Sequence, residues 1–334
     1  MSLGIGVIGA GVMGADHARN MAEHGVGLQV AAICDRDPAR AADTVAQAPG
    51  ARTESDPFAL IAAKDVDAVL VASPDETHAD YTLACIAAGK PVLCEKPLAS
   101  TIADCERIVE AEQAAGRRLV QVGFMRRFDP AYIDMKQRHA SGSLGDARLL
   151  HCIHRNASAP VFFTGLMAIT NSAVHEFDIC RWLLDAEIAR IHVHRSRPTT
   201  GSAGFKDPLV LVLEMDGGQL VDIEVFVNAG YGYDIRTELV CTHGTLTMLP
   251  PLMSEQRQAS VPAYAFAPDW RQRFRDAYRQ QIAAWTDSIR TGHPDGASAW
   301  DGLVATAVAE AGCKALESGS AEAVKLPARP PFYG

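Results

Sequence analysis

The stretch LGIGVIGAGVMGADHARNMAEHG, residues 3–25, decides the fold class of this chain. Its first half is a short apolar run typical of a buried strand, and its second half has the spacing of a helix that ends at Gly25. The turn between the two halves carries glycine at positions 9, 11 and 14, which is the pattern GxGxxG. A strand, this glycine pattern and a helix in that order indicate a dinucleotide-binding unit.

Each glycine of this turn has a physical reason. Gly9 permits the tight turn, Gly11 lets the backbone approach a pyrophosphate, and Gly14 lets the helix pack closely against the strand. The first turn of the helix then presents free N–H groups and a partial positive charge to the phosphates. Val12 and Met13 lie between the last two glycines and are therefore candidate cofactor-binding residues as well.

The next predicted strand ends at Asp35, 21 residues after Gly14. An acidic side chain at this place accepts hydrogen bonds from the ribose hydroxyls of adenosine and repels a 2′-phosphate, so the sequence predicts NAD rather than NADP as the cofactor. Arg36 keeps NADP as the alternative cofactor, because an arginine here either pairs with a phosphate or stacks on the adenine.

Short apolar runs alternate with helical patterns through the first 122 residues. Strands are predicted at 28–35, 66–74, 90–97 and 117–124, and helices at 37–48, 75–90 and 101–116. Repeated strand–helix–strand units imply a parallel, doubly wound sheet of the Rossmann type. We therefore expect an α/β fold whose residues 1–122 form a dinucleotide-binding domain.

Strands dominate after residue 123, with predicted strands in 147–156, 188–197, 208–228 and 233–250. The run MDGGQL at 215–220 is a hairpin signal, and the alternating pattern around it favours a large, mostly antiparallel sheet. We expect residues 123–334 to form an α+β domain for substrate binding and oligomerisation. Two amphipathic helices at about 270–317 are expected to pack back toward the first domain.

Composition excludes several classes of protein. The 334 residues are 48% hydrophobic and 21% charged, and the net charge of −9 argues against nucleic acid or an anionic membrane surface as the main partner. No apolar run approaches the ~18 residues of a membrane span, and the N-terminus has no basic segment typical of a signal peptide. The eight cysteines are scattered, which favours reduced thiols, a cytoplasmic location and no metal site.

Two further segments carry side chains suited to proton chemistry. Lys96, in CEKPLA at 94–99, follows a predicted strand and so lies at the carboxyl end of the sheet, where open α/β folds bind ligands. His175 lies in ITNSAVHEFD at 169–178, with Asn171 four residues before it and Asp178 three residues after it. In an α-helix these three side chains share one face, and a histidine among polar neighbours is typical of an acid/base site.

These motifs together resemble a known family. GAGVMG, EKP and a helix histidine followed by RWLL are similar to the two-domain NAD(P)-dependent oxidoreductases typified by glucose–fructose oxidoreductase and inositol dehydrogenase. The resemblance covers essentially the whole chain and is greatest to the inositol dehydrogenase subgroup. Segments of that subgroup follow in the same order as VGFMRRFDPAY, HCIHRN, VHEFD, YGYDI and SAWDG.

The resemblance implies an activity and the residues that carry it out. It implies NAD-dependent oxidation of a cyclic polyol, with myo-inositol giving 2-keto-myo-inositol (scyllo-inosose). Lys96 is implied to contact the reacting hydroxyl and the nicotinamide ribose, often before a cis proline, and His175 is implied to act as the base. Arg126 corresponds to a substrate-binding arginine, with Arg127 as the less favoured alternative.

The remaining candidate site residues fall into two groups. Besides the glycine turn and its aspartate and arginine, cofactor binding is assigned to Ser73, Pro74, His78, Glu95 and Lys96. Substrate binding is assigned to Arg126, His154, Asn156, Asn171, Ser172, His175, Asp178 and Tyr233. Asp178 is either a partner on the helix face or a substrate contact, Glu176 is expected to be solvated or structural, and Tyr231 and Tyr233 are expected to share a strand face.

Asn171 departs from the family pattern, because classical members carry aspartate four residues before the histidine. A carboxylate raises the pKa of a neighbouring histidine and stabilises imidazolium, whereas an amide orients the ring without neutralising its charge. Asn171 therefore either weakens the base or holds a substrate hydroxyl directly, since an amide both donates and accepts hydrogen bonds. We count it with Lys96 and His175 as a catalytic candidate.

The alternative functions are oxidation of another inositol stereoisomer or a sugar, an NAD-binding sensor without turnover, and redox-assisted glycoside cleavage in which NAD stays bound. Retention of both Lys96 and His175 argues against the sensor. Family members cover the sheet of the second domain by pairing subunits, so the resemblance also implies a homotetramer.

Overall fold

The computed structural model describes residues 2–160, 163, 165–197, 207–249, 255–259 and 261–334. Its elements form two compact units. The first unit combines the chain up to Phe128 with Asp276–Thr306 and Pro327–Gly334. The second unit combines Asp129–Arg275 with Ala307–Leu326.

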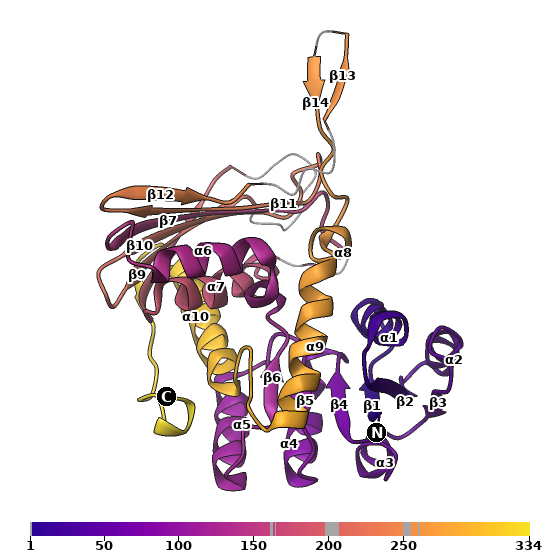
Figure 1. The fold of residues 1–334 in the computed structure, drawn as a ribbon. Helices are drawn as coiled ribbons and strands as arrows, with labels where there is room; N and C mark the ends of the chain where they lie inside the picture. The colour runs from indigo at the N-terminus through magenta and orange to yellow at the C-terminus, as the bar shows by residue number, and fades with distance from the viewer. Residues whose placement is uncertain (1, 161–162, 164, 198–206, 250–254, 260) are drawn as a thin grey trace. The chain divides into compact units, whose positions relative to one another are not determined.

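A six-stranded parallel sheet forms the centre of the first unit and confirms the predicted Rossmann fold. The strand order is β3-β2-β1-β4-β5-β6 (Figure 1). The strands are β1 (Leu3–Ile8), β2 (Leu28–Cys34), β3 (Arg52–Glu54), β4 (Ala68–Val71), β5 (Val92–Cys94) and β6 (Val120–Val122). The order reverses between β1 and β4, and such switch points are where doubly wound sheets bind ligands, outside the carboxyl ends of the strands.

Helices follow each strand of this sheet except the last. They are α1 (Val12–His24), α2 (Pro38–Ala46), α3 (Pro57–Ala62), α4 (His78–Ala87) and α5 (Ile102–Ala115). Two aspartates explain where two of these helices begin: Asp37 and Asp56 each precede a proline at the first helical position and accept a hydrogen bond from the first turn. The sequence pattern had not revealed β3 and α3, which have only three and six residues.

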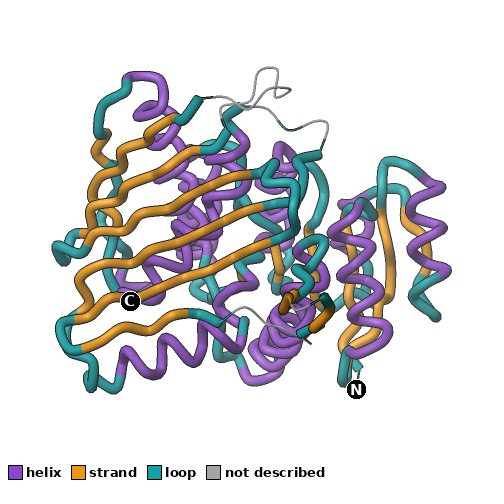
Figure 2. Tube along the Cα trace, turned by 90° about the horizontal axis from the view of Figure 1, so that it is seen from above, coloured by secondary structure: helices purple, strands orange, loops and turns teal. Residues whose placement is uncertain are grey.

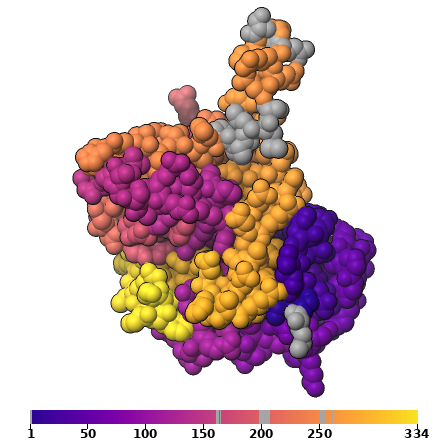
Figure 3. Space-filling view, viewed as in Figure 1, coloured from indigo at the N-terminus to yellow at the C-terminus, as the bar shows by residue number. Residues whose placement is uncertain are grey.

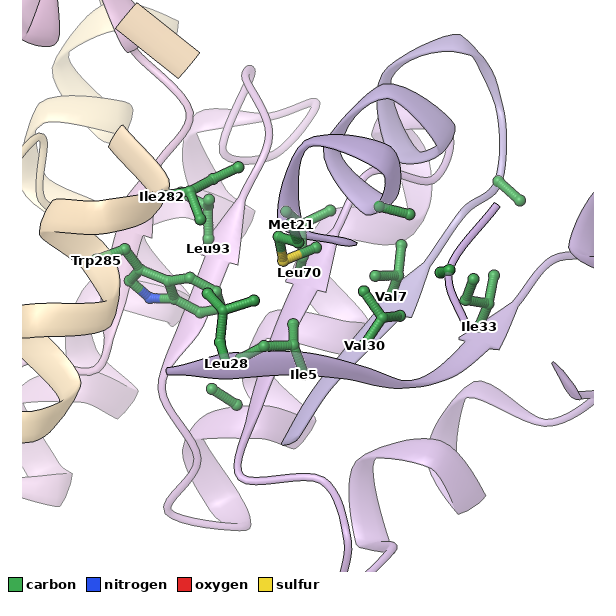
Figure 4. Close-up of a cluster of buried hydrophobic side chains, with 14 residues drawn as sticks. Ile5, Val7, Met21, Leu28, Val30, Ile33, Leu70, Leu93, Ile282 and Trp285 are labelled. Carbon is green, nitrogen blue, oxygen red and sulfur yellow. The ribbon is translucent and has the colours of Figure 1, made fainter. Parts of the chain in front are cut away.

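One face of the sheet is covered partly by a helix from far along the chain. Ile282 and Trp285 of α9 (Arg275–Thr291) belong to the same hydrophobic cluster as Met21 of α1 and Ile5 and Leu70 of the sheet (Figure 4). All five side chains are at most 3% exposed, so burial of apolar surface holds α9 in this unit.

The second unit is built on a seven-stranded, mixed sheet in the order β12-β11-β7-β10-β9-β8-β15. Only β7 and β10 pair in parallel, and the other neighbours are antiparallel, as the sequence predicted. The strands are β7 (Ala147–Arg155), β8 (Ile188–Arg195), β9 (Leu209–Met215), β10 (Leu220–Phe226), β11 (Asp234–Cys241), β12 (Gly244–Thr247) and β15 (Glu322–Ala323).

Helices cover one face of this sheet. The helices α6 (Pro130–Ala140) and α7 (Val174–Leu184) lie against it, and burial alternates along the strands as one covered face requires. The opposite face, which is toward the viewer in Figure 2, carries no helix of the described ranges. It presents a mixture of charged side chains and apolar ones such as Val210 and Leu220, which are 42% and 44% exposed.

A small hairpin of β13 (Gln256–Gln258) and β14 (Val261–Ala263) stands out from the surface of the second unit (Figure 3).

None of the helices in the described ranges combines the length and the apolar composition that a membrane crossing requires. The longest of them is α10 (Ala299–Ser318).

A buried carboxylate anchors the last residues of the chain in the first unit. Glu112 of α5 is fully buried, and its Oε1 accepts the N–H groups of Leu119 and Val120 at 2.5 and 2.6 Å. The hydroxyl of Tyr333 donates to its Oε2 at 2.6 Å. Burial raises the pKa of Glu112, and these three hydrogen bonds oppose that rise.

Replacing Tyr333 with phenylalanine is expected to destabilise the protein by about 1–3 kcal/mol, because Oε2 of Glu112 loses its donor while remaining buried. Urea unfolding at neutral pH, followed by circular dichroism, measures the change. Tyr264→Phe is the matched control, since this tyrosine is 46% exposed. Equal unfolding midpoints for both variants would show that the Glu112 anchor contributes nothing.

Candidate functional site

The glycine turn between β1 and α1 distinguishes two glycines that the fold requires from one that it does not. A Cβ on Gly9, whose φ is +96°, would lie 2.4 Å from the carbonyl oxygen of Ala72, and a Cβ on Gly14 would lie 1.8 Å from that of Gly9. A Cβ on Gly11 would meet no atom within 4 Å. Gly11 therefore faces open space, which fits a backbone that a ligand approaches closely.

The start of α1 fits a phosphate group. No side chain caps this helix end at Gly11, and its first turn contains no acidic residue, so the backbone N–H groups keep their partial positive charge. Val12 is 66% exposed here and Met13 is partly buried. The predicted pyrophosphate site thus has the chemistry that a dinucleotide needs.

Asp35 follows β2 and lies against the glycine turn. Its Oδ2 accepts the N–H of Ala10 at 2.7 Å, and its Oδ1 accepts the N–H of Asp37 at 2.8 Å. Arg40 comes within 3.4 Å of Oδ1, and Arg36 is exposed. A carboxylate has about four acceptor positions, so two hydrogen bonds leave capacity for the two ribose hydroxyls.

The loop after β4 and the first residue of α4 contain three of the predicted cofactor-binding residues. The hydroxyl of Ser73 lies 2.6 Å from that of Thr77, and Pro74 precedes the 3₁₀ turn η1 (Asp75–Thr77). His78 opens α4 with its ring between two backbone carbonyls, those of Ser73 and Pro97, at 2.9 and 2.7 Å. His78 thus joins this loop to the segment that carries Lys96.

Lys96 follows β5 at the carboxyl edge of the same sheet, and its peptide bond to Pro97 is cis, as the family resemblance implied. Burial lowers the pKa of the Lys96 ammonium, the charges of Glu95 and Asp75 raise it, and the positive charge of Arg126 lowers it further. The net direction is downward. A lysine with a lowered pKa beside a ligand-binding edge is typical of a functional group rather than a solvated charge.

The two arginines of MRRF have different environments in the turn η2 (Met125–Phe128). Arg126 is only 1% exposed, and its charge acts on Lys96. Arg127 forms an ion pair with Asp301 at 3.1 Å. The structure therefore groups Arg126, the favoured candidate, with Lys96, whereas Arg127 makes a structural contact inside the same unit.

In the second unit, the helical stretch around His175 is not a regular α-helix. Residues Ala168–Ala173 form a π-helical turn, η3, and α7 begins directly after it. His175 and Asp178 both lie in α7, are 9% and 1% exposed, and share a face as predicted. Asn171 lies in the π turn, where hydrogen bonds run from i to i+5, so its spacing of four from His175 does not by itself place both on one face.

His154 on β7 lies near both His175 and Tyr233, the residue that precedes β11. The ring centroid of His154 is 6.5 Å from that of His175 and 6.1 Å from that of Tyr233. Asn156 follows His154 after one residue, and its buried Oδ1 has no hydrogen-bond partner among the described residues. Ser172 is buried at the end of the π turn. The predicted substrate residues of this unit thus cluster at one end of β7 and α7.

Sequence reasoning missed the part played by Glu176. It is 1% exposed, which excludes the solvated alternative and fits the structural one, and its Oε2 accepts a hydrogen bond from Nδ1 of the buried His154 at 2.9 Å. This bond fixes which nitrogen of His154 carries the proton. The only signal of Glu176 in the sequence is its position directly after His175. Helical spacing does not show which residue of a neighbouring strand contacts it.

The two neighbouring tyrosines also differ from expectation. Tyr231 is 47% exposed, and its hydroxyl donates to Asp234 at 2.6 Å, whereas Tyr233 is 6% exposed. The strand β11 begins only at Asp234, so the alternation of a strand does not extend to both residues. Among the described residues, no group of three or more His, Cys, Asp or Glu side chains is arranged to hold a metal ion.

Comparison with known proteins agrees with both units. Residues 3–124 match the model of the oxidoreductase family with an NAD-binding Rossmann fold, and residues 132–247 match the GFO/IDH/MocA C-terminal domain. Inositol 2-dehydrogenase 1 of Saccharopolyspora erythraea is 51% identical over 336 residues, covering 100% of both chains. Inositol 2-dehydrogenase of Klebsiella pneumoniae is 44% identical, covering 100% of this chain and 99% of the relative.

A solved structure of myo-inositol dehydrogenase from Lactobacillus casei, in complex with NAD(H) and myo-inositol, has the same fold. The TM-score is 0.95 at 30% sequence identity, and the match covers 100% of both chains. Scyllo-inositol dehydrogenase from the same organism, with NAD(H) and scyllo-inositol bound, shares the fold with a TM-score of 0.89 at 24% identity, over 97% of this chain and 99% of that one.

Proposed function

Because the chain belongs to the GFO/IDH/MocA family of oxidoreductases with an NAD-binding Rossmann fold, we propose that it oxidises myo-inositol to 2-keto-myo-inositol with NAD. The observation that carries this proposal is similarity over the full length, at 44–51% identity, to proteins named inositol 2-dehydrogenase. The chain is thus an NAD-dependent oxidoreductase acting on a CH–OH group, and the particular inositol is the proposed part.

His175 is proposed as the general base. It takes the proton of the reacting hydroxyl, and the burial of its neighbours excludes water that would compete for that proton. Glu176 and His154 form a hydrogen-bonded pair near this ring and keep a second polar group in a fixed orientation. When bound, NAD supplies the acceptor for the hydride that leaves the substrate carbon.

Lys96 is proposed to stabilise the negative charge that develops on the substrate oxygen as its proton leaves. Its ammonium is the form that does so, and the adjacent Glu95 charge supports that form against burial and against Arg126. The glycine turn and Asp35 would hold the diphosphate and the adenosine ribose, and Val12, Met13, Ser73, Pro74 and His78 are proposed to complete the cofactor site.

A neutral polyol offers hydroxyl groups that both donate and accept. The buried Oδ1 of Asn156 fits a hydroxyl donor, since a buried acceptor without a partner costs free energy. Arg126, His154, Ser172, Asp178 and Tyr233 are the further proposed substrate contacts. Asp178, which is 1% exposed in α7 one turn after His175, adds an acceptor suited to a ring hydroxyl.

The proposal is tested with a panel of inositols and aldoses, each with NAD and with NADP, followed at the absorbance of the reduced cofactor. Oxidation of myo-inositol with NAD supports it. Turnover confined to another isomer or a sugar would assign that substrate instead. Binding of NAD without any reduction would favour a sensor, and hydrolysis of a glycoside without net NADH would favour the glycoside-cleaving alternative.

Replacing Asn171 with aspartate is expected to shift the pH dependence of the rate. A carboxylate near His175 would raise the pKa of the imidazolium formed during proton removal. The limb of the profile in which the base must be deprotonated should move to higher pH. Steady-state kcat and kcat/KM between acid and alkaline pH measure the shift. An unchanged profile with a raised KM for inositol would make Asn171 a substrate ligand instead.

A homotetramer is proposed from the sheet face on which the described part of the chain places no helix, since an exposed face with apolar side chains is covered when subunits pair. Light scattering of the purified protein gives the assembly mass directly. A monomer at micromolar concentration would contradict this proposal. The cytoplasmic location expected from the scattered cysteines stays a prediction.

A further inference from the structure

Two buried histidines hold the residues on either side of Lys96. Nε2 of His17, from α1, lies 2.8 Å from Oε1 of Glu95, and Nδ1 of His78, from α4, lies 2.7 Å from the carbonyl oxygen of Pro97. Both histidines are 1% exposed. The segment 95–97 is therefore bonded from two different helices of the same unit.

The surroundings of His17 select its neutral form. Its Nε2–H donates to the Glu95 carboxylate, while Nδ1 is buried without a hydrogen-bond partner among the described residues and the ring edge meets Tyr278 at 5.5 Å between centroids. A proton on Nδ1 would add a buried donor with nothing to accept it, which is costly. The hydrogen bond from His17 thus fixes one oxygen of the Glu95 carboxylate.

Glu95 transfers this fixed position to its neighbour. Its other oxygen, Oε2, accepts the backbone N–H of Lys96 at 3.2 Å. A Cβ on Gly123 would lie 2.8 Å from the same carboxylate, so the glycine leaves the space in which the carboxylate sits. The negative charge of Glu95 also raises the pKa of Lys96 and so favours its ammonium form.

The surroundings of His78 require the opposite protonation state. Its Nδ1 faces the carbonyl of Pro97 and its Nε2 faces the carbonyl of Ser73, at 2.7 and 2.9 Å, and carbonyl oxygens only accept hydrogen bonds. Both ring nitrogens must carry a proton to make these contacts. Burial lowers the pKa of His78, but Cys94, the Pro97 carbonyl and Asp75 raise it to about 10.

We propose that His17 and His78 are positioning residues for the dehydrogenase reaction: a neutral His17 fixes Glu95, a doubly protonated His78 fixes Pro97, and together they set the place of Lys96. The inference rests on the proposed role of Lys96 in catalysis. His78 also holds Ser73, and His17 lies in the helix that opens at the glycine turn, so Lys96 is tied to both proposed cofactor loops.

Paired substitutions separate the individual hydrogen bonds. A glutamine amide reaches the place of a histidine Nε2, and an asparagine amide reaches the place of Nδ1. His17→Gln therefore keeps the donor to Glu95, and His17→Leu removes it. His78→Asn keeps the bond to Pro97 and loses the bond to Ser73, and His78→Gln does the reverse. His24→Gln, at the exposed end of α1, is the control.

The expected result is a split between kcat and KM. A misplacement of about 1 Å can cost 10²-fold in rate, so His17→Leu and His78→Gln should lower kcat by about 10- to 100-fold. His17→Gln should recover most of the loss, and His78→Asn should act mainly on the KM for NAD. Equal losses in both members of either pair would overturn the proposal, because loss of folding does not depend on which nitrogen is replaced.

Imidazole ¹⁵N spectra of the wild-type protein, labelled at histidine, decide the protonation states without any turnover. His17 should show one protonated and one bare nitrogen, and His78 two protonated nitrogens up to a pH of about 10. A doubly protonated His17 or a singly protonated His78 would overturn the proposal. Because these spectra need no substrate, they remain decisive if no polyol is oxidised, so failure of the proposed function is recognised separately.

Discussion

Replacing His175 with glutamine is expected to lower kcat for inositol oxidation by about 10²- to 10⁴-fold, the range that a general base contributes. Glutamine keeps a polar side chain of similar length but cannot take up the proton. His175 is 9% exposed in α7, beside the buried pair of His154 and Glu176, so its surroundings limit the access of water that could replace it as base. The loss should therefore persist at saturating substrate.

Initial rates and a calorimetric titration with NAD test this prediction together. NAD affinity should stay close to that of the wild type, because the proposed cofactor residues belong to the first unit and His175 belongs to the second. His243→Gln is the matched control, as this histidine is exposed and belongs to the same unit as His175. A His175→Gln variant with kcat within threefold of wild type, roughly 0.6 kcal/mol, would remove His175 as the base.

Replacing Asp35 with serine is expected to reverse the preference between the two nicotinamide cofactors. The carboxylate repels a 2′-phosphate, whereas Arg36 and Arg40, which lies 3.4 Å from Asp35, are placed to attract one once that charge is gone. A charged hydrogen bond is worth about 1.5–3 kcal/mol, so kcat/KM should change by roughly 10- to 100-fold, upward for NADP and downward for NAD.

Asp35→Asn separates the charge from the hydrogen bonds. Its amide oxygen can still accept the N–H of Ala10, which Asp35 now holds at 2.7 Å, but it no longer repels a phosphate. NADP use should therefore rise in both variants, while the glycine turn is disturbed mainly by serine. If neither variant uses NADP better than the wild type, Asp35 does not set the cofactor preference.

The fold was predictable because short, continuous stretches of the sequence carry the patterns of strands, turns and helices in each unit. The strand before Gly9, the glycine turn and Asp35 predicted the Rossmann sheet, and MDGGQL with its alternating flanks predicted the antiparallel part of the second sheet. The short β3 and α3 were missed, because three and six residues are too few for periodicity to show.

The residues of the candidate site could be predicted from the sequence, but the hydrogen bonds between them could not. Lys96 and His175 could be named from motifs, whereas the bond of Glu176 to His154 joins a helix to a strand 22 residues away and leaves no local trace. His17 and His78 are similar cases, since their partners Glu95 and Pro97 lie in the segment after β5, far from them in the sequence. The spacing of residues in the sequence predicts which side chains share a face of a helix. Only the folded structure shows which carbonyl and carboxylate groups that face contacts.

The π turn at Ala168–Ala173 makes chain length, rather than composition, the sensitive property of this segment. A π turn holds one more residue than the α turn that it replaces. Deleting one residue there would let a regular helix run into α7, and everything before the deletion would rotate by about 100° around the helix axis. The buried residues at the start of the turn, Ala168 and Ile169, would then point away from the positions that they now occupy, so related sequences that keep this geometry should conserve the number of residues here.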